Sequence, residues 1–596
     1  MGSCSTKPVF SSLRKQKHEQ HAPMWVVKLS HVLEMPKGPP VGYEDLQRMG
    51  MLVEYQYQPE FLCIFVSHQW YGSSHPDRFG EQLQVFQQAL KNIISGEVEV
   101  ENDGQTQFLG IFLKLGRAER ERLQDAYVWM DWFSVPQSAS SGERRSACIS
   151  SIPFYVECCE IFLVLVPCVH HNDTGVECDY RSYLQRGWCR TEMMCKLLSD
   201  NDRVPIVVVS SPGTAAFMVP CQWVHSPAPD GDFTVDKDRE LCSEIIKVAL
   251  ACKIDGLKYD KKKRNLYRYL VARFESFCGL PSKSRNLSTF LHDFNFQSLQ
   301  EAVKQRHGMG AVACCAVSGD LERLKDFVAR GAPVETKLPA LPELDLGFPG
   351  FTPLMLATQN SWHSVAPVAE LLHLKANSNA KATGISVLAE ACTAETVRLL
   401  VEHRAEINAV QDPWRLPPLA VMAARPAVEM AALQEMLSLR ADVNAGSYAP
   451  FISLAAHYNG HANGPKVAQL LLDARADVNK AGSCESMLFS VLGMFSRTCS
   501  RCIQTQPILM KYFANLKGCT PLTCAVLMGD LELAKLLLLQ RADPDIKNYN
   551  GKKPFEVALN DEMRRKFEAL RATEEEDETG LHVLRACKSQ LVEVAL

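Results

Sequence analysis

The chain holds a set of polar and aromatic residues whose types could bind and transform a ligand: Ser67, Trp70, Arg78, Asp131, Trp132, Trp188 and Glu192. Carboxylates stabilise positive charge, tryptophan rings stack on flat ligands, and arginine pairs with phosphates. These residues lie far apart along the sequence, but several of them come directly after a short apolar run. What they can do therefore depends on whether the fold brings them together.

Four apolar runs are typical of strands buried on both faces: Phe61–Val66, Tyr127–Met130, Ile161–Val166 and Pro205–Val209. Stretches with helical periodicity separate them, at Phe79–Ser95, 111–125, Ser146–Val156 and Trp188–Leu198. Strands that alternate with helices predict a doubly wound sheet. We therefore expect residues 55–210 to form an α/β flavodoxin-like parallel-sheet domain. Ligands of such sheets bind at the carboxyl ends of the strands, where Ser67 and Asp131 would lie.

Several motifs of this segment resemble TIR domains. They are Phe65-Val66-Ser67 followed by Asp77-Arg78-Phe79, then Trp129-Met130-Asp131, then the run Ile161–Val166, and finally Trp188-Cys189-Arg190-Thr191-Glu192. The last of these matches the W-C-x-x-E motif of plant TIR domains, although the loop from Cys168 to Gly187 is longer here. The stretches Ser67–Trp70 and Asp131–Gln137 also resemble the related heterokaryon-incompatibility domains of fungi.

The TIR resemblance implies an activity and a site. Enzymatic TIR domains cleave the nicotinamide–ribose bond of NAD, and their catalytic carboxylate corresponds to Glu192. A carboxylate suits this reaction because it stabilises an oxocarbenium-like transition state. The other six residues of the opening set would bind the dinucleotide. Further rings and cations that could contribute are Trp129, Phe133, Arg186 and Arg190.

A second interpretation stays open. Many TIR domains only self-associate, and Glu192 could simply be a first-turn glutamate that the helix dipole favours. The domain would then be an interaction module without chemistry. If Glu192 meets Ser67, Trp70 or Asp131 at the strand ends, the enzyme is favoured; if it is buried in an ion pair elsewhere, the scaffold is favoured.

We expect no cofactor and no metal site. NAD would be a substrate rather than a bound cofactor. The 22 cysteines fall mostly within apolar runs and indicate reduced, buried thiols. The pair Cys499 and Cys502 has no second ligand pair nearby, and the loop residues His170, His171 and Asp173 have no zinc-finger spacing.

Composition and the amino terminus bear on location. The chain of 596 residues is 46% hydrophobic with a net charge of −4, which argues against disorder and gives no basic excess for binding nucleic acid. No apolar run is long enough to span a membrane. Gly2 and Thr6 fit the N-myristoylation pattern, and Cys4 could be a second acylation site. We therefore expect a cytoplasmic protein. Acylation of Gly2 and Cys4 would hold it at the inner face of a membrane.

The carboxyl-terminal half repeats itself. Gly319-Asp320-Leu321-Glu322 recurs as Gly529-Asp530-Leu531-Glu532, and Thr352-Pro353-Leu354 recurs as Thr520-Pro521-Leu522. The segments Arg440–Asn444 and Arg475–Asn479 are near copies, with variants at Ala332, Ala376, Ala405, Ala514 and Ala542. These marks resemble ankyrin repeats. Residues 309–571 are therefore expected to form an all-α ankyrin-repeat solenoid of about seven units that binds a protein partner.

The remaining segments are less informative. Residues 1–54 form an amino-terminal segment, and residues 211–308 form a helical connection. The latter holds the only strongly basic patch, Lys261–Arg264, which is typical of a solvated helix face but could bind a lipid headgroup or RNA. Residues 572–596 are an acidic tail.

Overall fold

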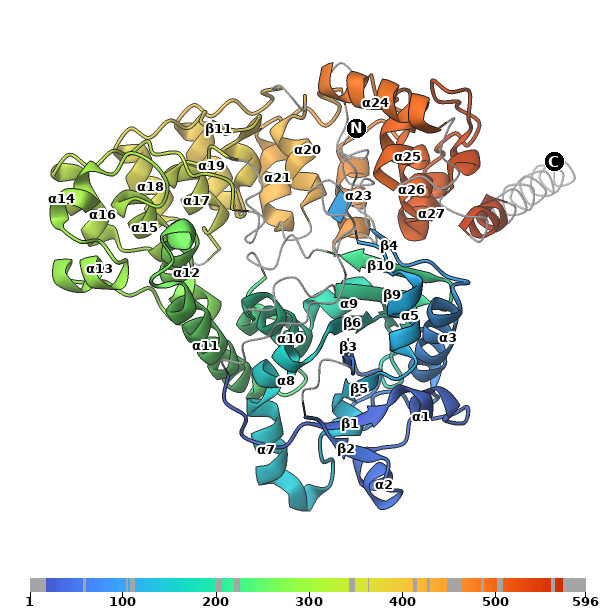
Figure 1. Cartoon of the computed structure of the whole chain (residues 1–596). Coiled ribbons are helices and arrows are strands. Elements are labelled where there is room, and N and C mark those ends of the chain that lie inside the picture. The colour runs from blue at the N-terminus through green and yellow to red at the C-terminus, as the bar shows by residue number, and fades with distance from the viewer. Residues whose placement is uncertain are drawn as a thin grey trace, which may run out of the picture. The chain divides into compact units, whose positions relative to one another are not determined.

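The computed structural model of the chain divides into two compact units, residues 1–382 and 383–596 (Figure 1). It describes residues 18–56, 61–102, 106–107, 113–199, 206–218, 226–341, 349–362, 364–410, 415–425, 429–447, 463–483, 487–500, 508–558 and 563–571. Gly2, Cys4, Cys502 and the acidic tail lie outside the described residues. The first unit holds the sheet, the connecting helices and two helix pairs of the predicted repeats.

An eight-stranded sheet with the order β2-β1-β5-β3-β6-β9-β10-β4 is the centre of the first unit. In chain order the strands are β1 (Trp25–Lys28), β2 (Leu52–Glu54), β3 (Cys63–His68), β4 (Glu101–Asn102), β5 (Tyr127–Met130), β6 (Ile161–Leu165), β9 (Ile206–Ser211) and β10 (Thr214–Met218). The predicted buried strands are therefore present as β3, β5, β6 and β9. The sheet also includes β1 and β2, which lie within the segment 1–54 that the sequence set apart.

The four central strands are parallel, and their neighbours on both sides are not. β3 pairs in parallel with β5 and β6, and β6 pairs in parallel with β9. β1 is antiparallel to β5, and β10 is antiparallel to β9. Counted along the chain, the central strands follow the order second, first, third, fourth. The chain thus winds to one side of β3 and then to the other, which places the carboxyl end of β3 at a switch point.

Helices cover both faces of the sheet (Figure 1). One face carries α1 (Leu29–Glu34), α3 (Glu81–Ser95) and α5 (Arg117–Leu123), and the other carries α8 (Ile152–Cys158), α10 (Gly187–Leu198) and α11 (Asp238–Leu257). The short elements at the rim of the sheet are α2 (Tyr43–Arg48), α6 (Asp131–Ser134), α7 (Gly142–Ser150), α9 (Tyr180–Gln185), β7 (Val169–His170) and β8 (Glu177–Cys178). Because both faces are covered, all six residues of β3 are buried.

Beyond α11 the first unit continues as helices. They are α12 (Arg264–Phe277), α13 (Leu287–Asp293), α14 (Leu299–Lys304), α15 (Ala311–Ser318), α16 (Leu321–Ala329), α17 (Pro353–Gln359) and α18 (Ala366–His373). In the second unit the corresponding helices are α19 (Ala394–Glu402), α20 (Pro418–Ala424), α21 (Met430–Ser438), α23 (Gly464–Asp473), α24 (Met487–Ser500), α25 (Ile508–Asn515), α26 (Pro521–Met528) and α27 (Leu531–Leu539). Short antiparallel pairs such as α15–α16 and α26–α27 are what the ankyrin marks predict.

The helix caps that the repeat marks predict are present. The Thr352 hydroxyl accepts a hydrogen bond from the backbone N–H of Met355, and Thr520 accepts one from Thr523. The carboxylate of Asp320 accepts from the N–H of Arg323, as Asp530 does from Leu533. Each cap satisfies a backbone donor that the first turn of a helix leaves free.

In these repeats, the second residue after the end of the second helix has a positive φ. These residues are Gly331, Lys375, Arg404, Arg440, Arg475 and Arg541, and an alanine follows every one of them. In each case the alanine N–H donates to the carbonyl five residues earlier at 2.9 Å, for example from Ala441 to Met436. This is the Schellman arrangement, in which glycine is the residue of lowest strain.

Replacing Arg440 by glycine should therefore stabilise the second unit. Arg440 is exposed and has a φ of 65°, so glycine removes the strain of its Cβ and is expected to raise the free energy of unfolding by about 0.5–1 kcal/mol. Urea unfolding of the full chain measures the change. Arg440→Ala is the control, because it removes the same side chain and keeps the Cβ. An equal gain in the alanine variant would contradict the explanation.

The pair α24–α25 is an insertion between two neighbouring repeats. Neighbouring repeats are joined by a hydrogen bond between their turns, as from the Asp477 N–H to the Asn444 side chain at 2.9 Å. The Asp543 N–H donates to the Asn479 side chain in the same way at 2.8 Å. The repeats ending at Ala476 and Ala542 are therefore neighbours. The ends of the insertion meet, because Gly518 N–H donates to the Gly482 carbonyl at 2.8 Å. The prediction that a repeat ends at Ala514 is therefore wrong.

Replacing residues 484–516 by a short turn should leave the second unit folded. Its two ends are already hydrogen-bonded, and each repeat contacts only its neighbours, so we expect the free energy of unfolding to change by no more than about 1 kcal/mol. Circular dichroism and urea unfolding of the full-length variant measure this. Deleting α27 instead should unfold the adjoining repeats. Loss of the cooperative transition in the first variant would contradict the assignment.

Candidate functional site

The carboxyl end of β3 brings Ser67 and Glu192 together. The Ser67 hydroxyl donates to Oε2 of Glu192 at 2.5 Å, and the Tyr183 hydroxyl lies 2.7 Å from Ser67 Oγ. Ser67 and Tyr183 are buried, whereas Glu192 is partly exposed. These three side chains come from β3, α9 and α10, which are far apart in the sequence. We call them the Ser67–Glu192 cluster.

The start of α10 fixes the position of Glu192. Gly187 begins the helix, and a Cβ at this position would lie 2.0 Å from the ring of Phe233. The N–H of Gly187 also donates to the carbonyl of Asp232 at 2.9 Å. Because the helix begins at Gly187, Glu192 lies in its second turn rather than its first. The helix dipole therefore does not account for this glutamate.

The environment of Glu192 favours its neutral form. Burial, with a smaller contribution from the nearby Asp131 carboxylate, raises its pKa to about 8 despite the opposing effects of Ser67 and His68. The carboxyl group is therefore largely protonated at neutral pH in the free protein. A cation placed beside it would favour the carboxylate.

A second group of side chains surrounds His68, the residue after Ser67. Its Nε2 lies 2.9 Å from Oδ1 of Asp131, and its Nδ1 lies 2.7 Å from Oε1 of Gln82. The Gln82 amide N–H donates to the Gln69 carbonyl, so its oxygen faces His68 as an acceptor. Both ring nitrogens thus face acceptors, which suits the doubly protonated imidazolium.

The pKa values of this pair agree with that state. Burial alone would lower the pKa of His68, but the Asp131 carboxylate and the hydrogen bonds raise it above its usual value. Burial would raise the pKa of Asp131, but His68 and the N–H groups of Trp70 and Trp132 lower it. Asp131 is therefore ionised, and about a third of its side chain is exposed to solvent.

Aromatic rings lie beside the Asp131 carboxylate. The Trp70 indole N–H donates to Asp131 Oδ2 at 2.8 Å, and the rings of Trp70 and Trp132 meet edge to face at 5.7 Å. The ring of His75 lies 4.5 Å from that of Trp132. Trp70, Trp132 and His75 are partly exposed, so these rings offer a surface for a flat ligand.

Other predicted residues lie elsewhere. The Trp188 indole N–H donates to Asp238 at 2.9 Å and so holds α11, and Arg78 is exposed beside Phe79. Neither has a recorded contact with the Ser67–Glu192 cluster. Trp129 and Phe133 are core residues, since each is no more than 1% exposed. Their prediction as stacking platforms is therefore wrong.

The arginines proposed for phosphate binding have structural contacts. Arg190 donates to the carbonyls of Leu184 and Pro227, and burial lowers its pKa. Arg186 donates to the Thr234 hydroxyl at 2.6 Å. Both side chains hold the loops around the start of α10.

Sequence reasoning missed three members of the site: His68, Gln82 and Tyr183. His68 had a signal, because it ends a buried strand beside Ser67. Gln82 lies in the first turn of α3, and Tyr183 lies on the short helix α9, within a stretch that the sequence predicts as a loop. Nothing in their local sequence distinguishes them from ordinary surface or core positions.

Within the described residues, no group of three or more His, Cys, Asp and Glu side chains could hold a metal ion. Within the same residues, no helix combines the length and the apolar character needed to cross a bilayer.

Comparisons with known proteins identify the repeats. Residues 517–549, which contain α26 and α27, match the ankyrin repeat family model. Among solved structures, the human ASB11 ankyrin repeat domain is 17% identical over 44% of this chain and 96% of its own, with a TM-score of 0.30. The ankyrin repeat domain of Bcl-3, a member of the IkappaB family, is 21% identical to this chain. The match covers 44% of this chain and 97% of the Bcl-3 domain, with a TM-score of 0.29. No curated protein matches the chain.

The second half of the chain therefore contains ankyrin repeats. The family match covers one repeat, and the caps, the Schellman ends and the hydrogen bonds between neighbouring turns extend the same pattern to the other units. Ankyrin repeats generally serve as protein-binding scaffolds. These matches concern the repeats and do not bear on the α/β domain.

Proposed function

We propose that the α/β domain hydrolyses NAD at the nicotinamide–ribose bond and that the ankyrin repeats bind the protein partner that directs this activity. The observation that carries the proposal is the contact of Glu192 with Ser67 at the carboxyl end of β3. Of the two interpretations of Glu192, this contact favours the enzyme over the scaffold.

The chemistry of the site fits this reaction. When the bond between ribose C1′ and the nicotinamide nitrogen breaks, its electron pair leaves with nicotinamide, which becomes neutral and needs no proton. Positive charge develops on the ribose, where the Glu192 carboxylate would stabilise it. Water then adds to C1′ and releases a proton, giving ADP-ribose.

Neighbouring groups would position the dinucleotide. The partly exposed Asp131 carboxylate, which is paired with His68, and the rings of Trp70 and Trp132 beside it provide a polar group and flat surfaces at the strand ends. The cationic nicotinamide ring suits such a surface, because aromatic faces and carboxylates both attract cations. The positive charge of the bound ring would also lower the pKa of Glu192 and ionise it.

The order of the strands supports the TIR resemblance. TIR-like sheets are doubly wound, and the central order second, first, third, fourth agrees with such winding. The alternative function is a scaffold that self-associates through the α/β domain. The protonated Glu192 of the free protein favours it, because a neutral hydrogen-bonded carboxyl can be a purely structural group.

Product analysis decides between the two. The full chain is incubated with NAD at several protein concentrations, because self-association could complete the site, and the products are separated by chromatography. We expect nicotinamide and ADP-ribose in equal amounts. NAD that stays intact at every protein concentration would leave the scaffold function.

A further inference from the structure

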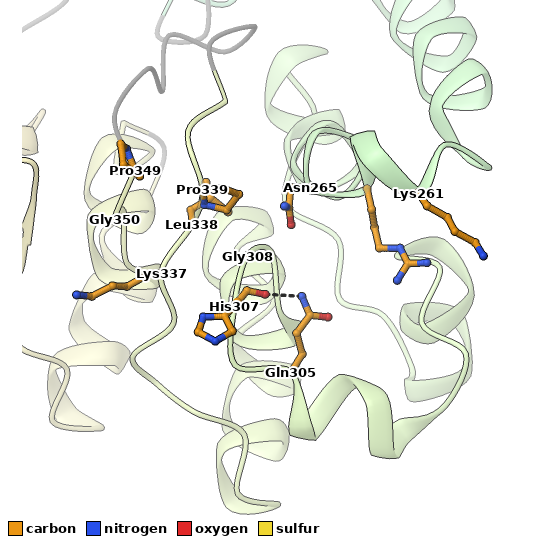
Figure 2. Close-up of a pocket in the computed structure, with 11 residues that line it drawn as sticks. Lys261, Asn265, Gln305, His307, Gly308, Lys337, Leu338, Pro339, Pro349 and Gly350 are labelled. Atoms are coloured by element: carbon orange, nitrogen blue, oxygen red, sulfur yellow. Dashed lines mark hydrogen bonds between the residues drawn. The ribbon is translucent and has the colours of Figure 1, made fainter.

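A pocket lies in the first unit, away from the Ser67–Glu192 cluster (Figure 2). It has a volume of about 570 Å³ and lies between the start of α12, the turn that follows α14 and the two sides of the loop after α16. Its walls include Lys261, Arg264, Asn265, Gln305, Gly308 and Lys337. This volume lies in the range of small-molecule sites, about 300–1,000 Å³.

The lining of the pocket is positively charged. Three permanent cations, Lys261, Arg264 and Lys337, contribute to it, and no aspartate or glutamate is among the described lining residues. Within the described part of the chain, neither lysine has an ion-pair partner. Two further lysines, Lys262 and Lys263, adjoin Lys261. The chain as a whole carries −4, so this cluster is a local exception.

One carboxylate lies near these cations. Oε1 of Glu301 is 3.7 Å from Arg264 and 3.5 Å from Arg268, so two arginines share a single negative charge. Asp260 accepts a hydrogen bond from the backbone N–H of Lys262 and caps the turn before α12. Neither of these acids pairs with Lys261 or Lys337. Counted over the described residues, the pocket lining therefore carries an excess of positive charge.

The walls are held in place before any ligand arrives. Asn265 Oδ1 accepts from the Met309 N–H at 2.9 Å, and the Gly308 N–H donates to the Lys337 carbonyl at 3.0 Å. The Gln305 amide donates to the His307 carbonyl at 2.7 Å, as Figure 2 shows. Gly308 has a φ of 73°, and a Cβ there would lie 2.4 Å from Asn265 Oδ1. Such preorganisation reduces the entropy lost on binding.

The cations are spread around the pocket. Figure 2 shows Lys261 and Lys337 on opposite sides of it, with Asn265 and Gln305 between them. A single phosphate could meet only one side, whereas a ligand with two or more phosphate groups could meet both. Lysine and arginine are strong donors to phosphate oxygens, and the amides of Asn265 and Gln305 suit the hydroxyl groups of a polar scaffold.

We propose that this pocket binds a small ligand carrying two or more phosphate groups. The ligand is either a soluble polyphosphorylated molecule or the phosphorylated headgroup of a membrane lipid, since both present the same chemistry. The site is independent of the NAD activity proposed above. Arg264 and Lys261 are its anchors on α12 and the preceding turn, and Lys337 is its anchor on the opposite wall.

Titration calorimetry of the full chain in about 0.1 M salt tests the proposal. The soluble probes are tripolyphosphate and inositol trisphosphate. The membrane probe is phosphatidylcholine vesicles with and without a phosphorylated phosphatidylinositol. The test variant is Lys261→Glu with Lys337→Glu, and the control variant is Lys91→Glu with Lys237→Glu. The control carries the same charge change at exposed lysines of α3 and of the segment before α11.

We expect the test variant to weaken binding at least about tenfold and the control to change it less than about twofold. Binding to tripolyphosphate or inositol trisphosphate at least as tight as binding to the vesicles identifies a free ligand, and tighter binding to the phosphoinositide vesicles than to inositol trisphosphate identifies a lipid headgroup. The neutral variant Lys261→Gln with Lys337→Gln should lie between wild type and the charge reversal. Equal weakening in test and control, failure of every probe to bind the wild type, or tighter binding of an RNA oligonucleotide would overturn the proposal.

Discussion

Replacing Glu192 by glutamine should lower the rate of nicotinamide release from NAD about 100- to 1,000-fold. Glutamine keeps an oxygen that can accept the hydrogen bond of Ser67, so the cluster stays together, but it cannot become an anion. Loss of one preorganised electrostatic group at a developing charge has this magnitude in other enzymes. The single-turnover rate of the full chain is the quantity to measure, because it excludes slow product release.

The control for this variant is Glu143→Gln. Glu143 lies on α7, is exposed, and belongs to the same domain, so the same chemical change there should leave the rate within about twofold. Circular dichroism of both variants checks the fold. Wild-type turnover by Glu192→Gln would reject Glu192 as the catalytic carboxylate and would favour a structural role for its neutral carboxyl group.

Replacing Arg268 by methionine should destabilise the first unit by about 3–5 kcal/mol. The Arg268 side chain is fully buried on α12 and donates to the carbonyls of Phe294, Asn295 and Met309 as well as to Gln305. Its guanidinium lies 3.6 Å from the centre of the Phe296 ring. Methionine fills similar space but leaves these acceptors unpaired in the protein interior.

Arg264→Met is the matched control, because Arg264 lies on the same helix and shares the Glu301 carboxylate. Its side chain is about 39% exposed, so we expect a loss below about 1 kcal/mol. Urea unfolding followed by fluorescence measures both variants. Similar small losses of stability in the two variants would mean that the buried acceptors find other partners. The hydrogen bonds of Arg268 would then not stabilise the first unit as expected.

The central part of the sheet could be predicted from the sequence because its strands are buried on both faces. β3, β5, β6 and β9 coincide with short apolar runs that are separated by stretches of helical periodicity. Runs of this kind are typical of parallel strands covered on both faces. β2 is the edge strand of the sheet and β1 is its neighbour. β2 has three residues, none of them buried, and β1 has four, of which only Val26 and Val27 are buried. Such short strands give no clear period, which is why the segment 1–54 appeared separate.

The candidate site was predicted in part. Ser67 and Asp131 could be predicted because each comes directly after an apolar run, and Glu192 because it stands in the W-C-x-x-E pattern. The partners His68, Gln82 and Tyr183 depend on how the helices pack on the sheet. Trp129 shows the opposite failure, since a tryptophan within a strand faces the core and stacks on Phe65 at 4.3 Å.

Counting the repeats by the spacing of their final alanines gives a wrong result where an insertion separates two repeats. Ala514 falls at a distance from Ala476 that a repeat would have, but the intervening residues form the α24–α25 pair. The backbone contacts of Gly482 with Gly518 and Cys519 reveal this, and no local sequence signal does. Ankyrin turns accept such insertions because they project from the array and leave the helix stacking unchanged.

The pH dependence of nicotinamide release by the wild-type chain tests whether the ionised Glu192 carboxylate catalyses the reaction. Burial raises the pKa of Glu192 to about 8, and only the carboxylate stabilises the ribose cation. We therefore expect kcat/KM to rise about tenfold per pH unit below pH 8 and to level off above it, because kcat/KM follows the ionisation of the free enzyme. A kcat/KM that is flat or falls between pH 6 and pH 8, or the absence of nicotinamide at every pH, would contradict the account.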